Sequence, residues 1–499
     1  MELQFKREVL TFLKPVLHQV QELEQTQEIR LPEDMPEVGR ILGVWGQPVM
    51  RGKQWQGDTA ELSAGMKVWV LYLSESGDGP WKLEAWIPFR MRWDLPEDCT
   101  EGKLRILMLP RFTDGRIVSA GKILIRAGIS ALAEGWSSCR QEYFRPEEPP
   151  RPLQLLRRTY PLRLASEAGE KTFRLEETLT LPVSAPQPEK LLYARLDPVI
   201  TDRKVLADKV VFRGSGNLHL CYAAADGQLH TWDFELPFSQ FSELEQSHSA
   251  DGQVDILPMV TGLELDQEEN GALRMEAGIT AQYLVDDRQL VELTEDAYHP
   301  ERELKLHRQE LELPALLETR RESISAEQMI PAAADLVVDM VSLPDFPRKQ
   351  IQGDNVRLEQ TGLLQVLYYD GEGALQTASR RWQGDRELKT GESASLFAVP
   401  QPGKVSQVLS GGEELTLRAE TAVQISTVCA HGMSMITGVE SGEVREKDPM
   451  GPSLILRRVP REGLWELAKA SGSTVESIQM ANGLEGEPEP GRMLLIPVV

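Results

Sequence analysis

Histidines, cysteines and carboxylates are the residues of this 499-residue sequence that could do chemistry. Seven histidines are spread along the chain, and none has the His-x-x-x-His or His-Glu-x-x-His spacing typical of zinc enzymes. The sequence also lacks a Gly-x-Ser-x-Gly nucleophile elbow and a Walker loop. Carboxylates are abundant, but an acidic surface supplies pairs by chance. We therefore expect no catalytic residue, no cofactor and no metal site, in a protein that is not an enzyme.

The best candidate for a metal pair is His219 with His230. The two lie on opposite strands of one predicted hairpin and could be cross-strand neighbours. The favoured interpretation is a pair on the solvent face. The positions that match His219 in two repeats of the hairpin, described below, hold Trp69 and Gln365, which are not metal ligands.

Cysteine usage and the N-terminus indicate the compartment. The cysteines share no position across the repeats, whereas a disulfide framework would repeat with them; they are Cys99, Cys139, Cys221 and Cys429. We expect reduced, mostly buried thiols. The N-terminus lacks a signal-peptide pattern, and the moderately apolar stretch Val9–Val20 is too short to span a bilayer. The expectation is a protein made and retained in the cytoplasm, without membrane insertion.

Charge restricts the partners. The formal net charge is −23, which disfavours nucleic-acid and anionic-membrane binding. A solvated acidic surface is the favoured interpretation, and a partner with a basic face is the alternative. The hydrophobic fraction of 41% supports folded domains rather than disorder.

The segment Gly216–Phe241 contains the hairpin around which the chain is organised. Apolar residues alternate on both sides of a turn at Asp226-Gly227, as in two paired strands. Related hairpins include Val68–Tyr72 and Leu364–Tyr368. The strand parity places Tyr72, Tyr222 and Tyr368 at matching inward positions.

A Leu/Ile-Pro motif precedes each hairpin, so three copies recur at a period of about 150 residues, which suits whole domains. We expect β-domains at 1–149, 150–299 and 300–446, joined by a proline cluster near 146–152. Each should be an antiparallel β-domain, a sandwich or an open barrel, with a short helix such as Glu33–Leu42. The fold class is thus mainly β.

The last residues, 454–499, have a different pattern. Two helices, Leu464–Ala470 and Val475–Ala481, are predicted between the strand-like runs Leu454–Val459 and Met493–Val498. Thr474 is placed to cap the second helix, and Asn482-Gly483 to end it. The sequence therefore predicts a small βααβ domain.

This βααβ unit resembles the LysM domain. The resemblance is carried by matching residues spread over the unit: Val459, Gly463, Leu464-Trp465, Leu467-Ala468, Gly472, Thr474-Val475, Ile478, Asn482-Gly483-Leu484, Pro490-Gly491 and Leu495-Ile496-Pro497. It departs at the first turn, where Arg461-Glu462-Gly463 is one residue shorter than the Gly-Asp-Thr turn of LysM domains. In carbohydrate-binding members that turn forms half of the groove for N-acetyl sugars.

The three long copies resemble the SPOCS domain, also called DUF3794, of sporulating Firmicutes. The matching segments are Leu31-Pro32 to Leu42, Lys209–Tyr222 and Glu235–Phe241, and the middle copy matches best. SPOCS copies followed by a terminal LysM are similar to spore-envelope morphogenetic proteins. This resemblance implies a tandem-repeat scaffold made in the mother cell and recruited to the forespore surface during spore coat assembly.

Two functions follow from these resemblances. In the first, the protein is structural and the LysM domain docks on a spore-envelope protein. In the second, the LysM domain binds peptidoglycan or another N-acetylglucosamine glycan. The groove residues implied for either ligand are Arg461, Glu462, Gly463, Leu464, Trp465, Gly483, Leu484 and Glu485. Arg461 and Trp465 are the expected contact residues, because arginine and tryptophan dominate interface energetics.

Overall fold

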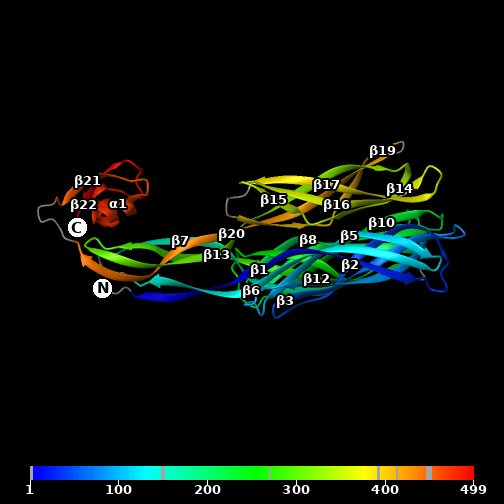
Figure 1. Cartoon of the computed structure of the whole chain (residues 1–499), viewed down its shortest axis with the longest axis horizontal. Helices are drawn as coiled ribbons and strands as arrows, with labels where there is room; N and C mark the ends of the chain where they lie inside the picture. Colours follow the sequence, from blue (N-terminus) through cyan, green and yellow to red (C-terminus); the bar gives the residue numbers. More distant parts are fainter. Residues whose placement is uncertain are drawn as a thin grey trace.

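The computed structural model shows an elongated, mainly β molecule (Figure 1). It describes residues 4–147, 152–268, 271–353, 355–389, 394–411, 414–445 and 452–498. The joints expected near 146–152 and 444–453 therefore lie partly outside the described residues. The described parts of the chain form three groups of antiparallel strands and one small unit with two helices.

The first copy has two three-stranded antiparallel sheets, ordered β1-β6-β5 and β2-β3-β4. Both sheets contribute side chains to one apolar core, so the copy is a sandwich. Its strands are β1 (Phe5–Arg30), β2 (Val38–Gln56), β3 (Thr59–Ser74), β4 (Trp81–Asp94), β5 (Lys103–Ser119) and β6 (Lys122–Pro146).

The second copy repeats this layout, with sheets ordered β11-β12-β7 and β10-β9-β8 around a core of its own. Its strands are β7 (Gln154–Leu179), β8 (Pro188–Leu206), β9 (Lys209–Ala224), β10 (Leu229–Glu243), β11 (Gln253–Gln267) and β12 (Leu273–Tyr298).

In the third copy two strands are interrupted, so that β14 and β15 stand where the others have one strand, as do β18 and β19. The strands are β13 (Arg302–Pro331), β14 (Ala334–Pro344), β15 (Arg348–Gln352), β16 (Asn355–Asp370), β17 (Leu375–Lys389), β18 (Ala394–Pro400), β19 (Lys404–Gly411) and β20 (Glu414–Val444).

Matching β-bulges show that the copies repeat in detail. The long first strand of each copy skips one residue in its pairing, at Val16, Ser166 and Leu317. Such bulges are features of a fold rather than defects. They confirm the repeat of about 150 residues. Whether the segments 1–149, 150–299 and 300–446 fold independently stays a prediction.

The prediction of a short helix at Glu33–Leu42 is wrong. Residues 33–37 form turns and irregular structure, and Val38–Gln56 is strand β2. A bulge in β2 at Gly39 places Val38 and Ile41 against the core of the first copy, whereas Leu42 is buried in the core that the copies share. The bulge and the burial of both strand faces thus imitate the helical spacing of Val38, Ile41 and Leu42. The described strands form several small antiparallel sheets, and none of these sheets closes into a barrel.

The prediction that Tyr72, Tyr222 and Tyr368 point inward is confirmed, since all three are buried. The first two also make the same hydrogen bond. The hydroxyl of Tyr72 donates to the carbonyl of Pro36 and that of Tyr222 to the carbonyl of Pro186, both over 3.0 Å. The ring fills the core while its hydroxyl fixes the loop after the Leu-Pro motif.

The second face of the hairpins is buried as well, because the three copies pack against one another. A shared core joins Trp45 and Leu71 of the first copy, Tyr193 and Cys221 of the second, and Leu367 of the third. The rings of Trp45 and Tyr193 stack with their centroids 4.5 Å apart. This arrangement holds three sandwiches together as one body.

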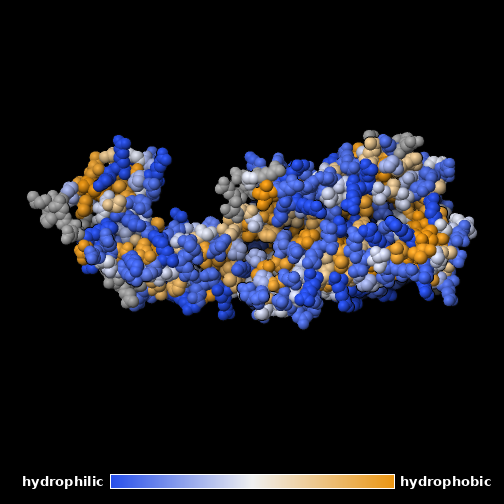
Figure 2. Space-filling model, in the orientation of Figure 1, coloured by the Kyte–Doolittle hydropathy of each residue, from blue (hydrophilic) through white to orange (hydrophobic). Residues whose placement is uncertain are grey.

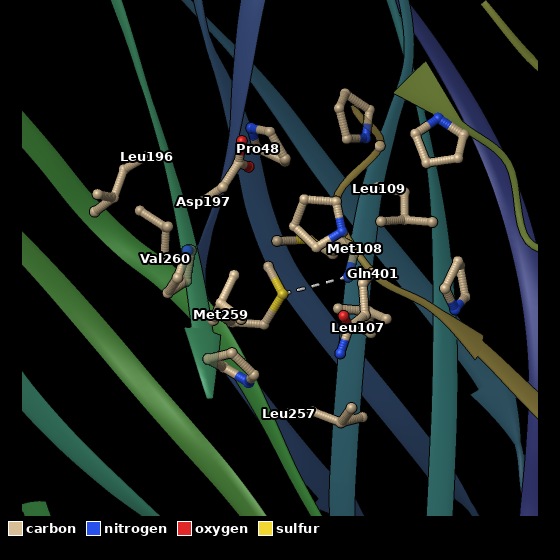
Figure 3. A pocket seen from close by; sticks show the side chains of 18 of the residues that line it. Pro48, Leu107, Met108, Leu109, Leu196, Asp197, Leu257, Met259, Val260 and Gln401 are labelled. Carbon is tan, nitrogen blue, oxygen red and sulfur yellow. Dashed lines mark hydrogen bonds between the residues drawn. The ribbon is translucent and has the colours of Figure 1, made fainter. Parts of the chain in front are cut away.

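Side chains of one copy form hydrogen bonds with backbone groups at the strand edges of another copy. The amide of Gln282 bonds both the N–H and the C=O of Ile106, each over 2.8 Å, and Gln47 accepts a bond from the N–H of Leu196. Prolines line a cavity of about 150 Å³ where the edges of all three copies meet (Figure 3). Proline cannot donate to a ladder, so these edges meet without pairing.

At one end of the molecule, the long strands of the three copies extend beyond the sandwiches into a narrower stalk (Figure 1). Strand pairs β1–β6, β7–β12 and β13–β20 share an apolar core there, which includes Phe12, Leu164, Leu293, Leu313 and Met435. The C-terminal unit lies at the free end of this stalk.

Two further properties bear on the expected compartment. All four cysteines are free, and Cys99 and Cys221 are buried. Among the described residues, neither helix has the length and apolarity needed to cross a bilayer.

Candidate docking site in the C-terminal unit

The C-terminal unit contains the predicted two helices between two strands. They are β21 (Leu454–Arg458), α1 (Leu464–Ser471), α2 (Val475–Asn482) and β22 (Met493–Pro497). As predicted, Thr474 caps α2, with its hydroxyl accepting a bond from the N–H of Ser477 over 3.1 Å. Gly483 ends α2 at a φ of 61°, in the left-handed region that glycine tolerates.

The first rim of the predicted groove is the turn between β21 and α1. Arg461 and Glu462 are exposed there, and Gly463 takes a φ of 95° before the first helical residue. Leu464 is fully buried in the core of the unit. Its side chain therefore supports the fold, and only its backbone faces the rim.

The second rim follows α2. Gly483 and Glu485 are exposed, while Leu484 is half-buried against the core of the unit. The N–H of Leu484 bonds the carbonyl of Gln479 over 3.0 Å, which closes the helix.

A residue that the sequence analysis did not select, Glu487, connects the two rims. Its carboxylate accepts a hydrogen bond from the N–H of Leu464, at the start of α1. A Cβ atom on Gly463 would lie only 2.5 Å from the same carboxylate oxygen. Glu487 thus caps α1, whose N-cap residue makes no side-chain hydrogen bond. The N–H of Leu464, which lies between the rims, is therefore already bonded. The place of Glu487 in an acidic, proline-containing run gave no helical or strand pattern to identify it.

Trp465, which was expected to contact a partner, contacts the second copy within this chain instead. Its indole N–H donates to Asp296 Oδ2 over 2.9 Å, and its ring meets that of Tyr298 at a centroid distance of 4.8 Å. Lys469 donates to the same carboxylate over 2.6 Å. The end of β12 therefore anchors α1.

Charge at this contact favours the folded arrangement. Burial would raise the pKa of Asp296, but the bonds from Lys469 and Trp465 outweigh it and lower that pKa. The hydroxyl of Tyr298 donates to the carbonyl of Ser473 over 3.0 Å, and burial raises its pKa. Tyr298 also belongs to the apolar core of the C-terminal unit.

The prediction that His219 and His230 form a solvent-face pair is wrong. The residue opposite His219 is Asp233, whereas His230 lies opposite Tyr222 and bonds Asp226. His219 is largely buried because its strand face packs on the third copy. In the part of the chain that the structure describes, no group of three or more histidines, cysteines or carboxylates is placed to hold a metal ion.

His219 instead belongs to an ionic network between copies. Its Nδ1 lies 2.6 Å from Asp233 Oδ1, and its Nε2 lies 3.1 Å from Asp339 Oδ1 in the third copy. Burial would lower the pKa of His219, but the two carboxylates raise it to about 9. Tyr193 donates to Asp339 over 2.6 Å. The network gives the copies polar contacts with defined geometry.

One comparison with known proteins identifies part of this chain. A family model described as the SPOCS domain of SipL matches residues 187–266, which cover β8–β10 and nearly all of β11. The middle copy is therefore similar to the SPOCS domain, which suggests a sporulation-related protein. Searches of curated proteins and of solved structures found no match.

Proposed function

We propose that this protein is a non-enzymatic structural protein of spore-envelope assembly that docks on a protein partner through its C-terminal LysM-like unit. The SPOCS match supports a role in sporulation. The three packed sandwiches form a body suited to a scaffold, and the unit at the free end of the stalk is placed to reach a partner. The proposed setting is the mother-cell cytoplasm, with recruitment to the forespore surface.

The observation that carries protein docking over glycan binding is the position of Glu487. A sugar site needs free backbone groups between the two rims and an apolar floor. Here the N–H of Leu464 is already bonded to Glu487, and Leu464 is buried. A glycan would have to displace an internal cap, so glycans should bind weakly or not at all.

Titration of the full chain with N-acetylglucosamine oligomers tests this proposal. We expect no saturable heat in isothermal calorimetry below millimolar concentrations. Saturable binding in the low micromolar range, lost when Gly483 and Glu485 are replaced, would instead establish the peptidoglycan-type alternative.

A further inference from the structure

The outer face of the β21–β22 hairpin is an exposed apolar surface. The register places Leu456 opposite Leu495, Leu454 opposite Pro497 and Arg458 opposite Met493. The exposed fractions of the four Leu and Met side chains run from 40% to 60%. Figure 2 shows this apolar patch on the C-terminal unit, at the end of the molecule. We call Leu454, Leu456, Met493 and Leu495 the hairpin face.

The fold of the unit does not account for the hairpin face. The opposite side of the same hairpin supplies Leu494 and Ile496 to the core under the helices. A half-buried sheet needs one apolar side, and its solvent side is usually polar. A contiguous exposed apolar patch with a polar rim marks an interaction site.

Arginines are concentrated around the β21–β22 hairpin. Arg458 shares the hairpin face, Arg457 is exposed on the other side of β21, and Arg461 and Arg492 lie in the turns at the end of the hairpin. None of the four forms an ion pair with another described residue. The chain as a whole carries a net charge of −23. A cluster of arginines without an ion-pair partner among the described residues, in so acidic a protein, favours an acidic occupant.

The free edge of β21 offers backbone hydrogen bonds. Among the described strands β21 pairs only with β22. The N–H of Val459 bonds the carbonyl of Arg492, and the N–H of Val498 bonds the carbonyl of Ser453. Because bonding alternates along an antiparallel strand, the backbone groups of Leu454, Leu456 and Arg458 point to the free edge. An extended segment could therefore pair there.

We propose that the hairpin face and the free edge of β21 bind an extended segment of a partner protein in which apolar and acidic residues alternate. The apolar side chains cover the hairpin face, the acidic ones lie on the opposite side of the added strand, where Arg457 is exposed, and the backbone adds a strand to β21. This inference rests on the proposed docking function and moves the contact from the groove to the hairpin.

Two other occupants fit the surface less well. A second copy would bring the same arginines against one another, which like-charge repulsion opposes. An anionic membrane would attract the arginines, but the strongly acidic body would be repelled from it. Both occupants are distinguishable outcomes of the test below.

The test selects ligands without assuming the partner. A phage library of random fifteen-residue peptides is panned against the full chain, and the affinities of the enriched peptides are measured by fluorescence polarisation. The disrupting variant is the double substitution Leu456→Asp with Leu495→Asp. Matched controls are Leu290→Asp, at an exposed leucine in the stalk, and Glu485→Lys in the predicted groove.

We expect enrichment of peptides with alternating apolar and acidic residues, and at least a ten-fold loss of affinity in the double variant only. Enrichment of basic peptides, binding that survives the double substitution, or no enrichment would overturn the inference. Two further results would also overturn the inference. One is flotation of the full chain with vesicles containing phosphatidylglycerol, and the other is dimerisation in sedimentation, in each case provided that the double variant loses the behaviour.

A second readout separates this inference from the proposed function. In sporulating cells, loss of forespore recruitment on removal of residues 454–499 supports docking by the unit. If the double variant is still recruited, docking survives and the hairpin inference fails. If removal of the whole unit has no effect, the proposed function itself fails.

Discussion

Asp339 connects the second and third copies at the scale of single residues. It accepts a bond from Tyr193 and lies at ion-pair distance from His219. Burial would raise the pKa of Asp339, but His219 and Arg195 hold it well below its usual range. A buried carboxylate of this kind needs its partners, because removing one leaves an uncompensated charge.

The network predicts a pH dependence of stability. The pKa of His219 is about 9 in the folded chain, above its ordinary value of 6.5. Its contribution is therefore fully present below pH 6.5 and is lost as the pH rises through 9. We expect the melting temperature of the wild type to fall over this range more steeply than that of His219→Gln, which carries the residue found at the matching Gln365. His307→Gln, at an exposed ion pair, is the control and should keep the wild-type slope.

Glu487 gives a second prediction at this scale. Replacing Glu487 by Ala removes the cap of α1 and should cost about 1 kcal/mol of the stability of the C-terminal unit. Differential scanning calorimetry of the full chain measures this, with Glu485→Ala as the matched control. Equal transitions in both variants would show that the carboxylate does not stabilise the helix.

The inward direction of Tyr222 could be predicted from the sequence, because the alternation within one strand decides it. The environment of His219 could not. Its burial comes from the third copy, more than a hundred residues along the chain, and no local pattern records that contact.

At the scale of elements, the edges of the sheets decide how the copies join. The side-chain amide of Gln282 on β12 makes the two backbone hydrogen bonds that a neighbouring strand would otherwise make with Ile106 on β5. The strands that carry these residues were predictable from alternation. The helix expected at Glu33–Leu42 was not a helix, because a bulge in β2 and the burial of both strand faces produced the same spacing of apolar residues.

Gln282→Ala should therefore destabilise the contact between the first and second copies. The substitution leaves the N–H and C=O of Ile106 buried without partners, which should cost about 2 kcal/mol or more. Urea denaturation measures the change. The exposed Gln19 on β1 serves as the control position, and an equal effect of Gln19→Ala would contradict the edge-capping role.

At the scale of the whole molecule, the shared core predicts how a cleaved chain behaves. From the sequence we expect limited proteolysis to cut first near Arg145–Arg151 and Val444–Ser453. Because Trp45, Tyr193 and Leu367 pack in one core, a chain cut at the first joint should stay together. Co-elution of the fragments in size-exclusion chromatography would show this, whereas separate elution would mean that the copies are independent.

The central claim is that the C-terminal unit recruits the scaffold. The repeat and the βααβ pattern were readable from sequence, but the bond between Glu487 and the N–H of Leu464 and the exposed hairpin face required the structure.

The most direct measurement is the location of a fluorescent fusion of the chain in sporulating cells, with and without residues 454–499. We predict a signal at the forespore surface for the full chain and a diffuse mother-cell signal for the shortened one, whose circular dichroism should retain the β spectrum of the three sandwiches. A shortened, folded chain that still gathers at the forespore surface would contradict the account.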